Sequence, residues 1–296
     1  MQLEFDPADM LDPAGVGAVG EDGRPSPPER LSPSGAATFE QCPRRWRFRY
    51  VDRLPDPPGE EALIGTFTHR VLEHLMQRHP GRRTKDDARR IARASWPEMS
   101  GSDDYRDLEL DDEQALEFRW KAWRAIEGLW ELEDPSGVEV QATEQQLSVT
   151  LDGVPFRGVV DRVESEPDGL VISDYKSGRA PTPRYAPSRL QQVLLYAAAV
   201  AAETGEQPVR ARLLYLGQKI VATGVTPVEL GGAVEQLKST WDAIGDACHA
   251  DDFSAQPGPL CGYCPYVERC TEGQTENLRR SELRAAEEES LLRLAG

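Results

Sequence analysis

Apolar residues recur at helical spacing through the first half of the chain. The clearest run lies in residues 61–79, where they fall three or four positions apart at Ile64, Phe67, Val71, Leu72, Leu75 and Met76. Because residues at this spacing share one side of an α-helix, the pattern predicts an amphipathic helix. Similar patterns predict helices over residues 85–96 and 111–130, and one over 39–50 that is interrupted or started by Pro43.

From Glu139 the pattern changes to short apolar runs rich in β-branched residues. They predict strands over residues 143–151, 156–164, 170–176, 209–216 and 219–225. The turn signals Asp152-Gly153 and Pro167-Asp168-Gly169 make the first three strands a meander. Helices are expected over 189–203, crossing to the fourth strand, and over 229–249. The expected fold class is therefore α/β, a mixed sheet flanked by helices.

The same patterns divide the chain into four segments. Residues 1–30 are rich in Pro, Gly and acidic residues and lack an apolar period, so we expect a disordered leader. Residues 31–135 are expected to form a helical region and residues 136–250 the sheet-containing core. Residues 251–296 hold three cysteines followed by a charged helix.

Composition argues against a membrane protein. The chain is 39% hydrophobic, and its longest apolar run, residues 193–202, is too short to cross a bilayer. Residues 1–12 are acidic and lack the basic-then-apolar order of a secretory signal, so we expect a cytoplasmic protein. In that compartment the cysteines should be thiols or metal ligands rather than disulfides.

Charge is distributed unevenly. The formal net charge of -17 argues against a protein that coats nucleic acid over its whole surface, because phosphates would be repelled. Basic residues gather in residues 43–50 and 78–93. Each stretch is either a solvated helix face or a place where phosphates bind. Within the first, Trp46 and Phe48 would either stack on single-stranded bases or belong to the core.

Two neighbouring strands carry the strongest chemical signal. Residues two apart in a strand share a face, so Asp174 and Lys176 point to the same side, and a hairpin can bring Asp161 beside them. Phosphodiester hydrolysis uses such a set: carboxylates hold Mg²⁺ or Mn²⁺, and a cation stabilises charge developing on phosphate. The alternative is a structural salt bridge between Lys176 and one of the aspartates.

A longer series of motifs resembles that of RecB-family nucleases of the PD-(D/E)xK type. In order it reads Gly65-x-x-x-His69-x-x-Leu72-Glu73, Gly158-Val-Val-Asp161, Asp174-Tyr-Lys176 and Gln192-Val-Leu-Leu-Tyr196, and it spans residues 31–270. The resemblance implies a restriction-endonuclease-like fold. It also implies that His69, Asp161, Asp174 and the carbonyl of Tyr175 bind metal, that Lys176 is catalytic, and that Gln192 and Tyr196 lie beside the site and the DNA strand.

Without that resemblance, several of these residues have plainer interpretations. Gln192 and Tyr196 lie four apart on one helical face and would read as helix packing. A histidine on an amphipathic helix is more often structural, and we expect that of His74 and His79. Glu144, one strand before Asp161, is expected to be an exposed strand residue, although it could assist the site.

The cysteines form a second pattern. Cys261, Cys264 and Cys270 follow the spacing C-x₂-C-x₅-C, and Cys42 lies far upstream. One distant cysteine with such a C-terminal group resembles the iron–sulfur nucleases of the AddB and CRISPR-adaptation type, which implies a [4Fe–4S] cluster. A structural Zn²⁺ site is the alternative, because four thiolates alone do not select the metal. Cys248 lies outside the pattern and is expected to be a buried apolar residue.

Together these patterns predict a metal-dependent deoxyribonuclease. The resemblance favours an exonuclease on single-stranded DNA ends, acting in DNA repair or recombination. The alternative is a non-catalytic DNA-binding or scaffold module of a repair or CRISPR-adaptation complex. The sequence holds no G-x-x-x-x-G-K-[ST] motif, so a partner helicase would have to unwind duplex DNA.

Overall fold

The computed structural model describes residues 24–295, with side chains up to residue 286. Most of the predicted leader therefore lies outside the described residues. Leu31 already belongs to the core, because its side chain is buried and its N–H donates to the Pro155 carbonyl at 2.8 Å. Across residues 24–295, every helix is either too short or too polar to span a lipid bilayer.

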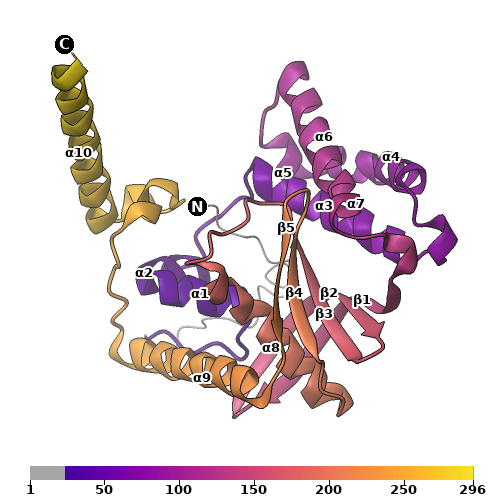
Figure 1. Ribbon diagram of the computed structural model, residues 1–296. Helices are drawn as coiled ribbons and strands as arrows, with labels where there is room; N and C mark the ends of the chain where they lie inside the picture. The colour runs from indigo at the N-terminus through magenta and orange to yellow at the C-terminus, as the bar shows by residue number, and fades with distance from the viewer. Residues whose placement is uncertain (1–23, 296) are drawn as a thin grey trace.

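A five-stranded sheet forms the centre of the protein (Figure 1). Its strands lie in chain order: β1 (Glu139–Leu151), β2 (Val154–Glu166), β3 (Gly169–Lys176), β4 (Arg210–Tyr215) and β5 (Lys219–Gly224). Strands β3 and β4 are parallel, whereas the other neighbouring pairs are antiparallel. Helix α8 (Ala186–Thr204) supplies the long crossover that a parallel pair requires. This mixed sheet confirms the expected α/β fold class.

The turns between the first three strands are those that the sequence predicts. Asp152 and Gly153 have positive φ angles of 45° and 82°, as a two-residue hairpin requires. Gly169 has a φ of 135°, a conformation that side chains rarely permit, at the turn from β2 to β3. These turns set the register that brings Arg162 opposite Ser173.

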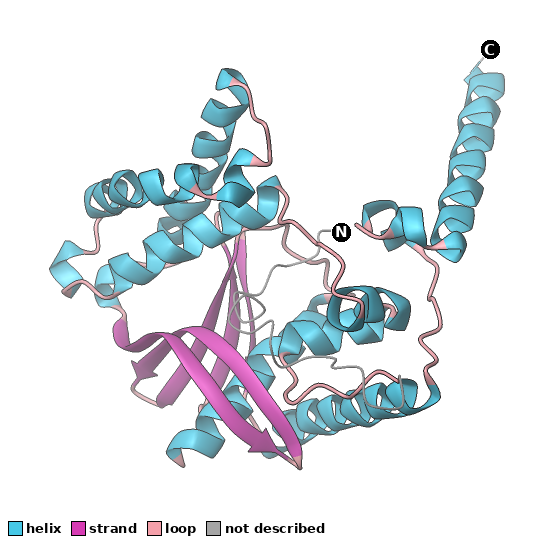
Figure 2. Ribbon diagram, turned by 180° about the vertical axis from the view of Figure 1, so that it is seen from behind, coloured by secondary structure: helices cyan, strands magenta, loops and turns pink. Residues whose placement is uncertain are grey.

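Three long helices lie together beside the sheet, where the first contacts β1 and β2 and the other two pack on that helix (Figure 2). They are α3 (Glu60–Met76), α4 (Lys85–Gly101) and α6 (Asp112–Glu127), and the shorter elements α5 (Asp103–Arg106), α7 (Leu129–Leu132), η3 (Pro80–Arg82) and η4 (Pro135–Gly137) connect them. Capping fixes where two helices begin: Thr84 accepts from the Asp87 N–H, and Asp111 from the Gln114 N–H. Their apolar faces share one core, which includes Phe67, Leu72, Phe118, Tyr175 and Leu214.

The opposite side of the sheet is covered by helices from both ends of the chain. Helix α8 lies against all five strands, and α9 (Pro227–Ala250) and α1 (Pro33–Gln41) pack on it. In α8 the residues from Leu195 to Val200 are all buried, which explains its almost continuous apolar sequence. Cys248 is fully buried in this core, as predicted.

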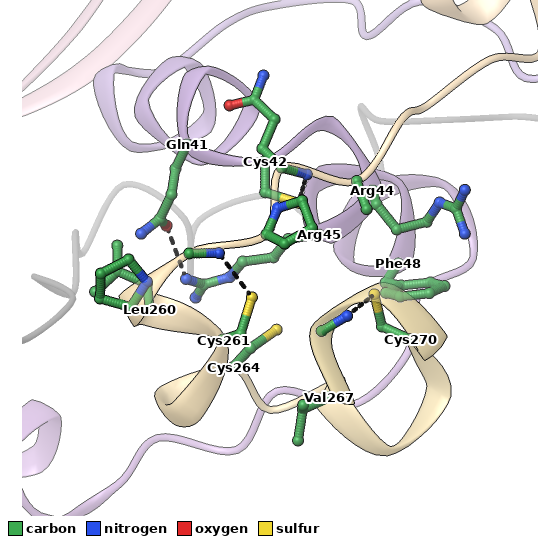
Figure 3. Close-up of a pocket in the computed structure, with 16 residues that line it drawn as sticks. Gln41, Cys42, Arg44, Arg45, Phe48, Leu260, Cys261, Cys264, Val267 and Cys270 are labelled. Carbon is green, nitrogen blue, oxygen red and sulfur yellow. Dashed lines mark hydrogen bonds between the residues drawn. The ribbon is translucent and has the colours of Figure 1, made fainter. Parts of the chain in front are cut away.

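The C-terminal segment returns to the N-terminal helices. It comprises η5 (Pro259–Tyr263), η6 (Val267–Arg269) and α10 (Thr271–Ala295), and α10 projects away from the body (Figure 1). Trp46, at the end of α2 (Pro43–Trp46), stacks on Phe253 with ring centroids 5.9 Å apart. Between the two parts lies a cavity of about 280 Å³ that is lined by Cys42, Cys261, Cys264 and Cys270 (Figure 3).

One predicted helix is divided. Cys42 adopts an extended conformation, with φ −165° and ψ 106°, because Pro43 disfavours the helical conformation in the residue before it. Helix α1 therefore ends at Gln41, and α2 continues into a π-helical turn, η2 (Arg47–Val51). The division of the chain at residues 31, 136 and 251 stays a prediction.

Candidate active site

The site begins where two strands part. The ladder between β2 and β3 ends at the Arg162–Ser173 pair. Beyond it, a carboxylate oxygen of Asp161 accepts a hydrogen bond from the Tyr175 N–H at 2.6 Å. The Asp161 side chain thus takes the place of a main-chain partner and is fixed at the base of the opening between the strands. It is 3% exposed.

Alternation along β3 brings the next two groups to the same place. Asp174 and Lys176 lie on one face of the strand, and the Lys176 Nζ is 3.0 Å from the Asp174 Oδ2. Both side chains are buried. Burial of a charged pair is costly unless further polar contacts compensate it. Strands β2 and β3 thus bring Asp161, Asp174 and Lys176 together, as the sequence predicts.

Helix α3 adds an imidazole from the opposite side of this opening. Val71 and Leu72 anchor the helix in the core, which turns His69 toward β2. Its Nδ1 lies 3.4 Å from the Asp161 Oδ2, and its ring packs edge-on against Tyr175. The α3 helix thus delivers the histidine that the motif series singles out. His79 lies away from this group, where its Nδ1 accepts a hydrogen bond from the Gly81 N–H at 3.3 Å.

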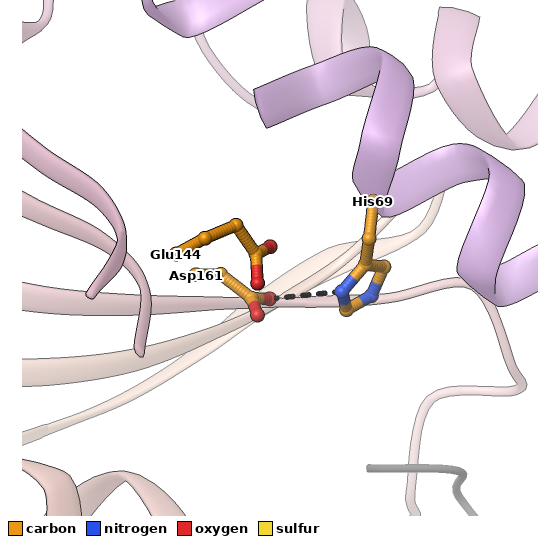
Figure 4. A group of neighbouring side chains, drawn as sticks. All are labelled: His69, Glu144 and Asp161. Carbon is orange, nitrogen blue, oxygen red and sulfur yellow. Dashed lines mark ion pairs between the residues drawn. The ribbon is translucent and has the colours of Figure 1, made fainter. Parts of the chain in front are cut away.

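Glu144 belongs to this group, which corrects the expectation of an exposed strand residue. It is half-buried, and its carboxylate lies with His69 and Asp161 in a set whose ligand atoms are all within 4.8 Å of one another (Figure 4). The cause is local backbone geometry: Glu144 has a φ of 46°, next to an irregularity in the β1–β2 register at Val140 and Ala142. Residue spacing gives no sign of this turn.

The electrostatics show that these groups compete for protons. Burial and the neighbouring Asp161 raise the pKa of Glu144 to about 8, and burial raises the pKa of Asp174 to about 7. Burial lowers the pKa of His69, but the Asp161 charge outweighs it and brings the pKa to about 9. For Asp161, burial is outweighed by His69, so its pKa is lowered. A divalent cation bound here would displace protons from these groups.

The buried carboxylates support a cation at this position. Asp161 and Asp174 are each 3% exposed, and Glu144 lies beside Asp161. Carboxylate oxygens suit Mg²⁺ and Mn²⁺, and imidazole is accepted by several divalent transition metals. The donor set of His69, Asp161 and Asp174, with Glu144 beside it, therefore fits a divalent metal ion.

Metal affinity should consequently fall as the pH is lowered. His69, Glu144 and Asp174, with pKa values of about 9, 8 and 7, must lose protons before they can bind a cation. We expect the dissociation constant for Mn²⁺ to rise by at least about tenfold per pH unit on acidification below neutrality, one factor of ten for each proton displaced. Isothermal titration calorimetry in buffers of different ionisation enthalpy measures both affinity and proton release. An affinity independent of pH would contradict the assignment.

Helix α8 positions Lys176. The Lys176 Nζ donates to the Gln192 Oε1 at 2.9 Å, and the Gln192 Nε2 donates to the Tyr196 hydroxyl at 3.0 Å. Gly158 makes room for this chain of contacts, because a Cβ there would lie 2.6 Å from the Tyr196 ring. The glycine before Val159 and Val160 is thus explained by the approach of an aromatic ring from α8.

An ion network lies beneath the site, on the other face of the sheet. Arg162 is fully buried and donates to Glu133 at 2.6 Å, to Glu164 at 3.0 Å and to the Tyr175 hydroxyl at 2.8 Å. Arg212 joins it through Ser173 and Glu164. The network holds Tyr175, whose N–H in turn fixes Asp161. Sequence reasoning missed it, because charged residues on a strand usually face solvent.

The arginines of the basic stretch, residues 43–50, form contacts within the protein. Its arginines bond to the C-terminal segment and to the following loop: Arg44 to the Phe253 carbonyl at 2.8 Å, Arg47 to Asp251 at 2.7 Å and Arg49 to Asp56 at 3.0 Å. Trp46 is 1% exposed and belongs to the core. Phe48 packs edge-on against Tyr266.

Comparison with known proteins identifies the family. Gene 69 protein of Mycobacterium phage D29 is 25% identical over 257 residues, which cover 78% of this chain and 93% of that protein. The crystal structure of a candidate exonuclease from Eubacterium rectale aligns over 80% of this chain and 93% of its own, with a TM-score of 0.38 and 15% identity. A model of the PD-(D/E)XK nuclease superfamily matches residues 30–271. The chain therefore belongs to the PD-(D/E)XK nuclease superfamily.

Proposed function

We propose that this protein is a RecB-like deoxyribonuclease that hydrolyses phosphodiester bonds with Mg²⁺ or Mn²⁺, working from single-stranded ends in DNA repair or recombination. The observation that carries the proposal is the convergence of Asp161, Asp174 and Lys176 with His69 where β2 and β3 part. The order of these residues along the chain, which resembles RecB-family nucleases, supports the choice of substrate and of exonuclease action.

The metal would be held by His69, Asp161 and Asp174, with the Tyr175 carbonyl as a further oxygen ligand and Glu144 as an additional carboxylate. When bound, a divalent cation supplies Lewis-acid chemistry at the phosphate. The three acidic side chains and the imidazole would also set the position of the cation relative to Lys176. Asp161 is itself held by the Tyr175 N–H, so its position does not depend on the metal.

Lys176 is the proposed catalytic cation. Its ammonium would orient the attacking water or stabilise the charge that develops on the phosphate oxygens. Asp174 and Gln192 hold the Nζ from two directions, at 3.0 Å and 2.9 Å, so few rotamers remain open to it. Tyr196 fixes Gln192 in turn and acts as a positioning residue.

Cleavage of labelled DNA tests the function. With Mn²⁺ or Mg²⁺ we expect linear single strands to be degraded, closed circular single strands to resist, and blunt duplexes to be cut only when a helicase supplies single-stranded ends. Cleavage should stop with chelator and fall steeply with salt, because phosphate binding releases counterions. Cutting of closed circles would instead indicate an endonuclease. Binding without any cleavage would favour a non-catalytic module of a repair or CRISPR-adaptation complex.

For the four cysteines we propose a [4Fe–4S] cluster, as in AddB-type nucleases. Their thiols line one cavity of about 280 Å³, whereas a water molecule in the liquid occupies about 30 Å³. Main-chain N–H groups of Gln256, Gly258 and Gly273 approach the sulfurs of Cys42, Cys261 and Cys270 at 3.4–3.5 Å. Such contacts favour thiolate ligands of a cluster.

Replacement of one distant ligand tests the cluster. In anaerobically purified protein, Cys42→Ser should lose the visible absorption, iron and sulfide of the cluster and lower the melting temperature, since metal binding contributes to folding. Cys248→Ala is the matched control and should keep its iron, because Cys248 lies in the α8–α9 core. Zinc instead of iron in the wild-type protein would overturn the assignment and favour a Zn²⁺ site.

A further inference from the structure

The segment after Lys176 differs in charge from the rest of the molecule. In a chain with a formal charge of -17, residues 175–202 contain no acidic residue but carry Lys176, Arg179, Arg184 and Arg189. Arg179 and Arg184 are exposed, and neither forms an ion pair with a carboxylate in the part of the chain that the structure describes. We call residues 177–185, which join β3 to α8, the β3–α8 loop.

This loop is held in one conformation beside the site. The Gln218 side chain accepts from the Ala180 N–H at 2.9 Å and donates to the Gly178 carbonyl at 2.8 Å. The Lys219 Nζ donates to the Pro181 carbonyl at 2.7 Å. At its base, Ser177 lies against Gly65, one helical turn before His69. Because these contacts already hold the loop in one conformation, it loses little conformational entropy when a ligand binds.

The tip of the loop presents a cation and an aromatic ring together. A turn closed by hydrogen bonds from the Tyr185 and Ala186 N–H groups to the Thr182 carbonyl projects Arg184 and Tyr185 outward. Tyr185 is 50% exposed, and the Arg184 guanidinium lies 5.6 Å from the centroid of its ring. Exposed rings beside arginines suit single-stranded nucleic acid, because bases stack on the ring while the cation meets the phosphate.

We propose that the β3–α8 loop binds the single strand as it enters the site, with Tyr185 stacking on a base and Arg179 and Arg184 contacting phosphates. This inference rests on the proposed nuclease function, because the loop directly follows the proposed catalytic residue Lys176 in the chain. It assigns the strand-binding role to this loop rather than to residues 43–50, whose arginines are bonded within the protein.

Binding without cleavage tests the proposal. In a Lys176→Ala background, fluorescence anisotropy with labelled oligothymidylate should show that Tyr185→Ala weakens binding by about 5- to 150-fold, the range that stacking on one base contributes. The same substitution should leave binding of an abasic oligonucleotide unchanged. Arg179→Ala and Arg184→Ala should each reduce the slope of log affinity against log salt by about 0.7, one phosphate contact.

The controls are an exposed tyrosine and a half-exposed lysine away from the loop, Tyr263→Ala and Lys238→Ala, which should bind as the parent does. Equal weakening of the normal and abasic oligonucleotides by Tyr185→Ala, or no weakening, would overturn the stacking role. If the protein cleaves DNA but Tyr185→Ala leaves KM unchanged, the loop proposal fails while the nuclease stands. If Tyr185-dependent binding is found without cleavage, the loop proposal stands and the nuclease fails.

Discussion

Lys176→Ala should reduce the rate of phosphodiester cleavage by about a hundredfold to a thousandfold, the range seen when one group that stabilises transition-state charge is removed. The Lys176 Nζ lies 3.0 Å from the Asp174 Oδ2, and Gln192 holds it there. Because Lys176 is not a proposed metal ligand, affinity for Mn²⁺ should be kept. Single-turnover cleavage and calorimetric metal binding measure the two effects separately.

Lys238→Ala is the matched control, because Lys238 is a half-exposed lysine on α9 that pairs with Asp242 at 3.5 Å. It should cleave at the wild-type rate. If Lys176 serves only as a structural salt bridge, its replacement would lower the melting temperature and leave the cleavage rate of folded protein unchanged. That outcome would contradict the catalytic role.

Arg162→Met should lower the free energy of unfolding by about 3–5 kcal/mol, the cost of leaving buried charges without their partner. Arg162 is fully buried, and its removal would leave Arg212 as the remaining arginine partner of Glu133 and Glu164, which are 11% and 3% exposed at their side chains. The Tyr175 hydroxyl would lose its donor as well. Urea denaturation followed by circular dichroism measures the change.

Arg210→Met provides the comparison on the neighbouring strand. Arg210 pairs with Glu166, but its side chain is 40% exposed, so water can replace the lost contact. Its replacement should change stability by no more than about 1 kcal/mol. Similar losses for the two variants would show that the network around Arg162 is not the stabilising feature we take it to be.

Much of the fold is predictable because strong local signals agree with the tertiary structure. The apolar spacing of residues 61–79 gives helix α3 within a few residues, and Asp152-Gly153 gives the β1–β2 turn. The positions of Asp161, Asp174 and Lys176 follow from strand alternation and hairpin pairing. In these regions the local preference of the chain and its packing require the same conformation.

The remainder depends on contacts between segments that are distant in sequence. Glu144 reaches the site through a left-handed backbone conformation that glutamate does not favour. The arginines of residues 43–50 are matched by Asp56, Asp251 and the Phe253 carbonyl, and no local pattern reveals those partners. Likewise, the buried position of Arg162 follows only once Glu133, Glu164 and Arg212 surround it.

Tyr175 connects two surfaces that would otherwise be independent. Its main-chain nitrogen faces the carboxylate of Asp161, while its phenol reaches through to the guanidinium on the far face of the sheet. The phenol of Tyr175 is therefore required by its contact with Arg162, on the face of the sheet opposite Asp174 and Lys176. A substitution of Tyr175 would therefore affect the site first through the loss of the contact between its hydroxyl and Arg162.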